Sequence, residues 1–321
     1  DGDEIITKDG KPISQSRRAH YQVFGRIMGR FLKVAGRVDI ACDEVDKEFI
    51  LSFRDFIINE YKFAKDKRWS YLYTGLKRNM VPTKPRGQNT VSMMMKMFQA
   101  FFKMLDANDE IPKNPFNKFT GANHAALLRQ EYSKPIALTL EELRRILLAD
   151  VPAGLQETKE AFLLQCALGC RISDFKKMGM EQINVSKSGV PYIMYVSQKT
   201  GMPTRTPIVR FAFDIIKKTT FNFPVLKYVS GKSGFNKKIK TLLKECGIDR
   251  QVETGAEESK LVTFPLYELA STKLGRKTNV TLLSRVQINT TIAGLHADGS
   301  EAVSHYYDPV SYTHLRAHET R

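Results

Sequence analysis

The stretch "QCALGCRISDF", residues 165–175, decides how the whole chain is interpreted. Its apolar residues are those of a core helix, and they run into Gly169 and Cys170 before two charged residues appear. Arg171 then stands three residues ahead of Asp174. An ion pair on a solvated helix end would explain this pattern. The alternative is that Arg171 binds a phosphate. The residues in the rest of the chain distinguish the ion pair from the phosphate-binding arginine.

Composition points to a polyanionic partner. The 321 residues leave room for about two domains, and 42% hydrophobic with 26% charged residues is typical of a soluble globular protein. Lys and Arg number 50 against 34 Asp and Glu, a net charge of +16. The pI near 9.6 favours nucleic acid as the partner, with an anionic membrane second. No apolar run of membrane length and no signal peptide is found, so we expect a cytoplasmic protein without membrane contact.

The cysteines do not form a metal-binding pattern. None of the four belongs to a CxxC pair, and two of them lie one helical turn apart in an apolar run. We therefore expect buried free thiols in a reducing compartment, with no zinc site. The four are Cys42, Cys166, Cys170 and Cys246.

The first part of the chain has the apolar spacing of amphipathic helices. After a polar lead-in at 1–16, apolar residues recur at i, i+3, i+4 and i+7 near 24–31, 49–57 and 91–105. Residues 17–120 are expected to form a helical domain, which a linker at 121–136 follows. The methionines near position 95 keep the helical spacing, so core packing is favoured over a cofactor pocket.

A basic segment with interspersed aromatic residues, 62–86, separates the second and third of these helices. It carries Trp69, Tyr71 and Tyr73. With a charge of +16 on the chain, contact with a DNA backbone is favoured over a merely solvated surface. The candidate DNA-binding residues are Lys65, Lys67, Arg68, Lys77, Arg78, Lys84 and Arg86.

A second domain is expected at 137–308. Thr139 to Glu142 has the capping-box pattern that begins a helix, and a further helix is expected near 158–169, with a short one from Ser173. Residues 183–209 alternate between apolar and polar residues and contain two glycine turns, which predicts three short antiparallel strands. Everything beyond about Phe211 is expected to be mostly helical.

The last residues, "PVSYTHLRAHETR" at 309–321, fit nothing before them. They resemble the translation of a transposon-end adapter used in sequencing libraries, so we expect a non-native tail that replaces the natural end after about Asp308. An ordinary polar tail is the alternative. The missing initiator methionine suggests a fragment.

Five features follow one another between residues 171 and 306. They are Arg171 with Asp174, Lys199 in the turn of a strand pair, Arg276 within "STKLGRKT", His296 after Gly294-Leu295, and Tyr306. This order resembles the tyrosine recombinases, the phage-integrase family, whose pattern is an R-x-S-[ED] box, a hairpin lysine, an H-x-x-R box, a histidine or tryptophan, and a nucleophilic tyrosine. The resemblance covers 137–308 as the catalytic part and 17–120 as the core-binding domain.

The resemblance implies a fold that is mainly α with a small antiparallel β-sheet. It comprises a helical, SAM-like core-binding N-terminal domain and an α+β tyrosine-recombinase catalytic domain. The implied partner is double-stranded DNA, bound by a homotetramer on two DNA sites, with an accessory directionality factor as a further possible partner. The implied activity is site-specific recombination or integration of a mobile genetic element, without metal or cofactor.

The residue types suit the chemistry of phosphodiester transfer. Arg171 and Arg276 would hold the oxygens of a phosphorane, since each guanidinium offers a planar fork of donors. Asp174 would orient Arg171. Lys199 would protonate the leaving 5′ oxygen, and Tyr306 would attack phosphorus to form a 3′-phosphotyrosyl bond.

The chain departs from the family pattern at two points. Lys273 stands where the first histidine is usual, so we expect it to donate a hydrogen bond to the phosphate rather than act as a base. Tyr306 follows His296 by ten residues instead of nine. The alternatives for these roles are Tyr307 and Tyr312 for the nucleophile, and Lys187 and Lys232 for the hairpin lysine.

Two other functions compete with recombination. A type IB topoisomerase-like nicking-closing enzyme would share the phosphotyrosyl chemistry. A catalytically degenerate helical DNA-binding protein would share the basic charge and the helices.

Overall fold

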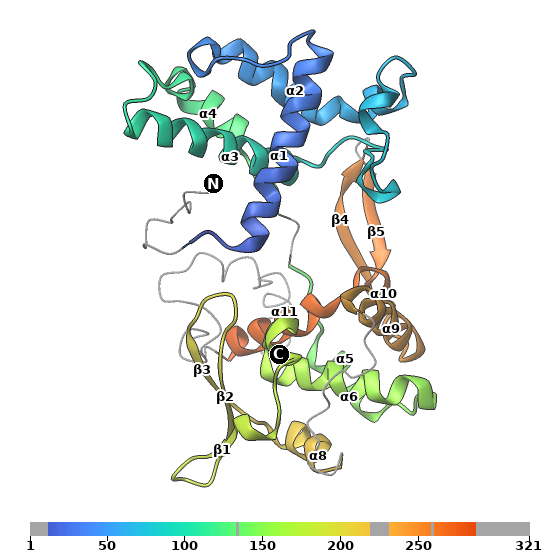
Figure 1. Cartoon of the computed structure of the whole chain (residues 1–321). Coiled ribbons are helices and arrows are strands. Elements are labelled where there is room, and N and C mark those ends of the chain that lie inside the picture. Colours follow the sequence, from blue (N-terminus) through green and yellow to red (C-terminus); the bar gives the residue numbers. More distant parts are fainter. Residues whose placement is uncertain (1–11, 133–134, 219–230, 258–259, 287–321) are drawn as a thin grey trace. The chain divides into compact units, whose positions relative to one another are not determined.

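The computed structural model describes residues 12–132, 135–218, 231–257 and 260–286. The chain divides into two compact units, Asp1–Glu131 and Tyr132–Arg321, and helices dominate both (Figure 1). The fold class expected from the sequence, mainly α with a small antiparallel sheet, is confirmed. Within the described ranges, no helix is long and apolar enough to cross a membrane.

The first unit is built on the three amphipathic helices that the apolar spacing predicts. Ser14 and Asp46 cap the first two, because each side chain accepts a hydrogen bond from the backbone three residues on. A fourth helix lies within the stretch 121–136, for which the sequence suggested a linker. The helices are α1 (Gln15–Val34), α2 (Lys47–Lys65), α3 (Gln88–Ala107) and α4 (Gly121–Leu128), with 3₁₀ turns η1 (Cys42–Glu44), η2 (Ser70–Tyr73), η3 (Arg78–Met80) and η4 (Pro115–Lys118).

Phenylalanines fill the core of this unit. The ring of Phe53 lies 5.5 Å from that of Phe24, 5.3 Å from that of Phe31 and 5.6 Å from that of Phe98, which joins α1, α2 and α3. Edge-on ring pairs at such distances add to the stabilisation from burial alone. Met94, Met95 and Met97 are buried, so core packing is confirmed for these three α3 methionines, whereas Met93 is half-buried.

The second unit is organised around α6, whose side chains are buried on nearly every face. Leu164 and Phe162 on this helix are fully buried among residues of the neighbouring helices. The capping box from Thr139 to Glu142 forms as predicted. The helices are α5 (Leu140–Leu148), α6 (Ala153–Leu168), α7 (Ile172–Phe175), α8 (Arg210–Lys218), α9 (Gly231–Glu245), α10 (Leu266–Leu269) and α11 (Thr272–Arg285), with the 3₁₀ turn η5 (Met180–Gln182).

The three predicted strands form an antiparallel sheet in the order β1-β2-β3. They are β1 (Ile183–Val185), β2 (Pro191–Val196) and β3 (Pro203–Pro207). Ile193 pairs with Ile183 on one side and Thr206 on the other, and it is fully buried. The sheet therefore presents its β2 centre to the core.

The expectation of a mostly helical chain after Phe211 is wrong at one place. The strands β4 (Gln251–Glu257) and β5 (Lys260–Pro265) form a two-stranded antiparallel sheet, with an irregularity between Glu253 and Gly255 (Figure 1). Such a ribbon buries little surface; Phe264, for example, is 38% exposed. Apolar residues therefore have little reason to alternate with polar ones, and the period of two that would reveal a strand is weak.

Candidate active site

The end of α6 sets the position of the candidate site. Gly169 caps the helix with φ 61°, a left-handed conformation that glycine adopts without penalty. A Cβ on Gly169 would lie 2.2 Å from Oδ1 of Asn279, so the α11 side chain packs directly against this turn. The Nδ2 of Asn279 donates to the carbonyl oxygens of Cys166 and Ala167, each at 2.9 Å. These bonds occupy carbonyls that a helix end leaves unsatisfied, and they tie α11 to the end of α6.

Arg276 approaches the same turn from α11. It lies one helical turn before Asn279, so both side chains face α6. Its Nη1 donates to the carbonyl oxygen of Gly169 at 2.8 Å, and the residue is only 4% exposed. Arg276, the second arginine of the predicted site, is thus bonded to a residue that precedes Arg171 by only two positions.

Arg171 is held by a neutral group. Its Nη1 donates to Oγ of Ser197 at 3.2 Å, and that hydroxyl lies 3.5 Å from Oδ2 of Asp174, to which it can donate. No carboxylate in the described part of the chain forms an ion pair with Arg171, so the helix-end ion pair with Asp174 does not form there. The carboxylate of Asp174 lies one hydrogen bond removed from Arg171, beyond the hydroxyl of Ser197.

Lys199 lies in the turn between β2 and β3, and its side chain is exposed. The turn is closed by backbone bonds from Ser197 to the oxygen of Met202 at 2.9 Å and from Gly201 to the oxygen of Ser197 at 2.7 Å. The N–H of Gln198 donates to Oδ1 of Asp174 at 3.0 Å. Asp174 therefore joins the hairpin to the segment that carries Arg171.

The rival Lys187 occupies the other turn of β2. That turn, between β1 and β2, lies at the opposite end of the strand from Lys199. No bond to the Arg171 segment is found there among the described contacts. The geometry favours Lys199 over Lys187 as the lysine that accompanies Arg171.

Lys273 is exposed in the first turn of α11, and Lys277 follows one turn later. Burial lowers the pKa of Lys277, and the charge of Lys273 lowers it further. Lys277 was not among the site residues expected from the sequence, although its spacing of four from Lys273 places both lysines on one helix face. Two neighbouring ammonium groups beside Arg276 favour an anion in their vicinity.

Cys170 and Tyr195 lie within the electrostatic reach of this site. Burial raises the pKa of Cys170 to about 12; the carboxylate of Asp174 acts in the same direction, while Arg276 opposes it. Burial also raises the pKa of Tyr195. Both groups stay protonated at neutral pH, so neither has the character of a nucleophile.

The free cysteines Cys166, Cys170 and Cys246 are buried as expected, whereas Cys42 is half-buried.

The remaining predicted site residues lie outside the described residues. They are His296 and Tyr306 with the alternatives Tyr307 and Tyr312, and the side chain of Lys232 lies outside as well. The structure therefore brings together Arg171, Asp174, Arg276 and the hairpin of Lys199. In the described ranges, no cluster of three metal-ligating side chains is found.

The basic segment of the first unit divides into two kinds of residue. Its exposed side chains are Lys65, Lys67, Arg68, Lys77, Arg78 and Lys84, and Arg68 pairs with Asp66 at 2.8 Å. Arg86 differs, because it pairs with the fully buried Glu60, which also binds Arg30 at 2.7 Å. Arg86 thus anchors the end of the segment to α2.

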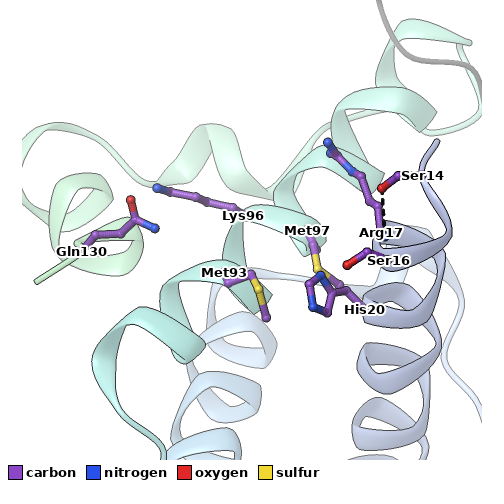
Figure 2. A pocket seen from close by; sticks show the side chains of 8 residues that line it. All are labelled: Ser14, Ser16, Arg17, His20, Met93, Lys96, Met97 and Gln130. Carbon is purple, nitrogen blue, oxygen red and sulfur yellow. Dashed lines mark hydrogen bonds between the residues drawn. The ribbon is translucent and has the colours of Figure 1, made fainter. Parts of the chain in front are cut away.

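A pocket of about 360 Å³ lies between the start of α1 and α3 in this unit. Figure 2 shows His20 beside the two methionines Met93 and Met97, with Arg17 and Lys96 at the margins. No local pattern in the sequence predicts this pocket, because its basic residues come from two helices far apart in the chain. The cationic side chains of Arg17 and Lys96 line this pocket.

Comparison with solved structures reveals the fold. A lambda integrase fragment, solved as a dimer bound to a core site, matches with a TM-score of 0.59 at 14% identity, covering 92% of this chain and 89% of its own. The Tn1549 transposon integrase, in complex with circular intermediate DNA, matches with a TM-score of 0.55 at 14% identity, covering 96% and 94%. The XerH recombinase, bound to its palindromic difH substrate, matches with a TM-score of 0.52 at 11% identity, covering 93% and 78%.

These three proteins are tyrosine recombinases, and the chain has their fold. No protein-family model and no curated protein sequence matches it. The fold expected from the resemblance is thereby confirmed.

Proposed function

We propose that the chain is a site-specific DNA recombinase or integrase that cleaves and rejoins DNA through a 3′-phosphotyrosyl intermediate. The observation that carries the proposal is the turn after α6, which leads into Arg171 and whose Gly169 carbonyl binds Arg276. The hairpin of Lys199 is bonded to the same segment through Asp174. Fixed donors aimed at developing negative charge are commonly the largest catalytic contribution, roughly 3–4 kcal/mol for one donor.

Each residue then has a defined role in the proposed reaction. Arg171 and Arg276, assisted by Lys273 and His296, hold the non-bridging oxygens of the scissile phosphate. The phenolic oxygen of Tyr306 attacks phosphorus and loses its proton, while the bond from phosphorus to the 5′ oxygen breaks and Lys199 protonates that oxygen. The phosphotyrosyl bond conserves the phosphodiester, so rejoining needs neither ATP nor metal.

Binding to DNA is the second part of the proposal. The charge of +16 and the exposed lysines and arginines of segment 62–86 support contact with many phosphates. A solved neighbour, lambda integrase, forms a tetramer on a Holliday junction. We extend that assembly to this chain as a homotetramer on two DNA sites, acting in the cytoplasm with an accessory directionality factor.

A nicked suicide substrate tests the proposal, because the short downstream fragment, which carries the new 5′-hydroxyl end, diffuses away and the covalent adduct accumulates. Candidate sites come from the DNA that flanks the reading frame. We expect an adduct with the wild-type chain, none with Tyr306→Phe, and an unchanged yield with Tyr307→Phe. An adduct that survives Tyr306→Phe would overturn the nucleophile.

The same assay distinguishes the competing functions. Failure of the wild-type chain to form an adduct on any flanking sequence would overturn catalysis in favour of a DNA-binding protein. Relaxation of supercoiled plasmids without a target site would favour a nicking-closing enzyme instead.

A further inference from the structure

Ser197 has no role in the residue pattern of the tyrosine recombinases, yet it lies where the segment that carries Arg171 meets the hairpin that carries Lys199. It directly follows β2 and is only 4% exposed. Its hydroxyl accepts a hydrogen bond from Nη1 of Arg171 at 3.2 Å and lies 3.5 Å from Oδ2 of Asp174. A hydroxyl is suited to this place because it accepts and donates at once.

The backbone around Ser197 is equally constrained. Its N–H donates to the oxygen of Met202 at 2.9 Å, and its own carbonyl accepts from Gly201 at 2.7 Å. The next residue, Gln198, donates its N–H to Oδ1 of Asp174 at 3.0 Å. These hydrogen bonds fix the backbone on both sides of Lys199. The Cα atom of Lys199, two residues along the chain, lies within about 7 Å of the Cα atom of Ser197.

The hydroxyl of Ser197, as a neutral partner, also leaves the positive charge of Arg171 uncancelled. A carboxylate bonded directly to the guanidinium would neutralise it and compete with a phosphate. The hydroxyl of Ser197 orients the same guanidinium without cancelling its charge, and the carboxylate of Asp174 stays one hydrogen bond removed.

We propose that Ser197 is a positioning residue that couples Arg171 to the hairpin bearing Lys199, so that one hydroxyl sets both the phosphate clamp and the leaving-group acid. The inference rests on the proposed function, because it concerns the same phosphate. Loss of the hydroxyl should misplace both groups, and a misplacement of about 1 Å can cost about 100-fold in rate.

Two suicide substrates separate the two arms of this coupling. One carries the ordinary 5′ oxygen at the scissile position, and the other carries a bridging 5′ sulfur, which leaves as a thiolate without needing a proton. Lys199→Ala should be slow on the oxygen substrate and near wild-type on the sulfur substrate. Arg171→Ala should be equally slow on both.

We expect Ser197→Ala to cleave the oxygen substrate about 100-fold more slowly than wild type, and the sulfur substrate to recover only part of that loss. Ser197→Thr, which keeps the hydroxyl, should restore most of the rate. Ser197→Cys keeps the size of the side chain, but its thiol forms only weak hydrogen bonds. It should therefore cleave as slowly as Ser197→Ala, and it tests the proposal even if Ser197→Ala folds poorly. Melting temperature and DNA affinity are measured for each.

The matched control is Ser186→Ala. Ser186 lies in the other turn of β2, where its hydroxyl accepts a hydrogen bond from the N–H of Val190 at 3.0 Å. The Ser186→Ala variant should cleave DNA at the wild-type rate. Complete recovery of Ser197→Ala on sulfur, no recovery at all, or no defect on oxygen would each overturn the coupling. If the wild-type chain forms no adduct on either substrate, the proposed function fails instead, and the two failures are thereby distinguished.

Discussion

The two units of the chain each hold an arginine by its guanidinium, but with opposite consequences for its charge. In the helical unit, Arg30 and Arg86 both bind Glu60, a carboxylate that is fully buried. In the second unit, Arg171 is bonded to the hydroxyl of Ser197. The first arrangement pairs two guanidinium groups with one carboxylate and fixes the fold, whereas the second fixes a guanidinium that is bonded to no carboxylate among the described residues.

The comparison explains why arginines of similar burial have different uses. Arg30 also lies over the ring of Tyr73, with its Cζ 5.2 Å from the ring centroid. All its partners belong to the core of the unit, so a phosphate could reach it only by displacing them. Arg171, by contrast, has no carboxylate partner in the described part of the chain that a phosphate would have to displace.

Glu60→Ala should have the largest effect. Removing the carboxylate leaves two guanidinium groups inside the helical unit, which costs about 3–5 kcal/mol in the free energy of unfolding. Trp69, the single tryptophan of the chain, lies in this unit, so its fluorescence in urea reports the unit directly.

Glu44→Ala is the matched control for that experiment. Its exposed pair with Arg37, at 3.2 Å, should contribute at most about 1 kcal/mol. Equal losses for Glu60→Ala and Glu44→Ala would show that the buried carboxylate does not hold the unit together.

Arg171→Ala should lower the rate of cleavage by about 100- to 1,000-fold while changing the melting temperature little. The reason is that its guanidinium would stabilise the charge of the phosphate, whereas it forms no ion pair that stabilises the fold in the described part of the chain. Single-turnover adduct formation at saturating DNA measures the rate, with Arg37→Ala as an exposed control. A large drop in melting temperature with an unchanged rate would place Arg171 with Arg30 instead.

Gly169→Ala should cost about 1–2 kcal/mol from the left-handed backbone alone. The new Cβ would also displace Asn279, which bonds the end of α6, and would disturb the carbonyl that holds Arg276. Thermal unfolding and adduct formation should therefore both decline. A stability loss without any loss of cleavage would mean that the turn does not position Arg276 for catalysis.

The smallest effect should appear in alkali. Burial raises the pKa of Tyr73 from its ordinary 10.0 to about 12, with the charge of Glu60 acting in the same direction. The unfolded chain loses this proton near pH 10 and the folded chain only near 12, so stability is full below pH 10 and falls between these values. Trp69-detected unfolding should show the fall, and Tyr73→Phe should reduce it; Tyr71→Phe, at an exposed residue, should not.

Much of this architecture follows from local sequence. The apolar spacing of α1, α2 and α3, the capping box at Thr139 and the alternation of β1 to β3 each reflect burial of one face, which leaves a period in the sequence. The order of Arg171, Lys199 and Arg276 could likewise be recognised before the structure.

What local sequence could not predict are contacts between distant residues. Glu60 stands in an amphipathic helix like any surface glutamate, and only the fold brings Arg30 and Arg86 onto it. Ser197 is one of many serines beside a turn, and its bond to Arg171 depends on how β2 docks on α7. The β4–β5 ribbon was missed for the related reason that it buries too little to leave a period.

The central claim is that Arg171 keeps its charge for the scissile phosphate. A suicide substrate with a neutral methylphosphonate at the scissile position measures this directly, because it lacks the charge that the guanidinium would stabilise. We predict that Arg171→Ala forms adduct far more slowly than wild type on the ordinary phosphate and close to the wild-type rate on the methylphosphonate. An equally large defect of Arg171→Ala on both substrates would contradict the account.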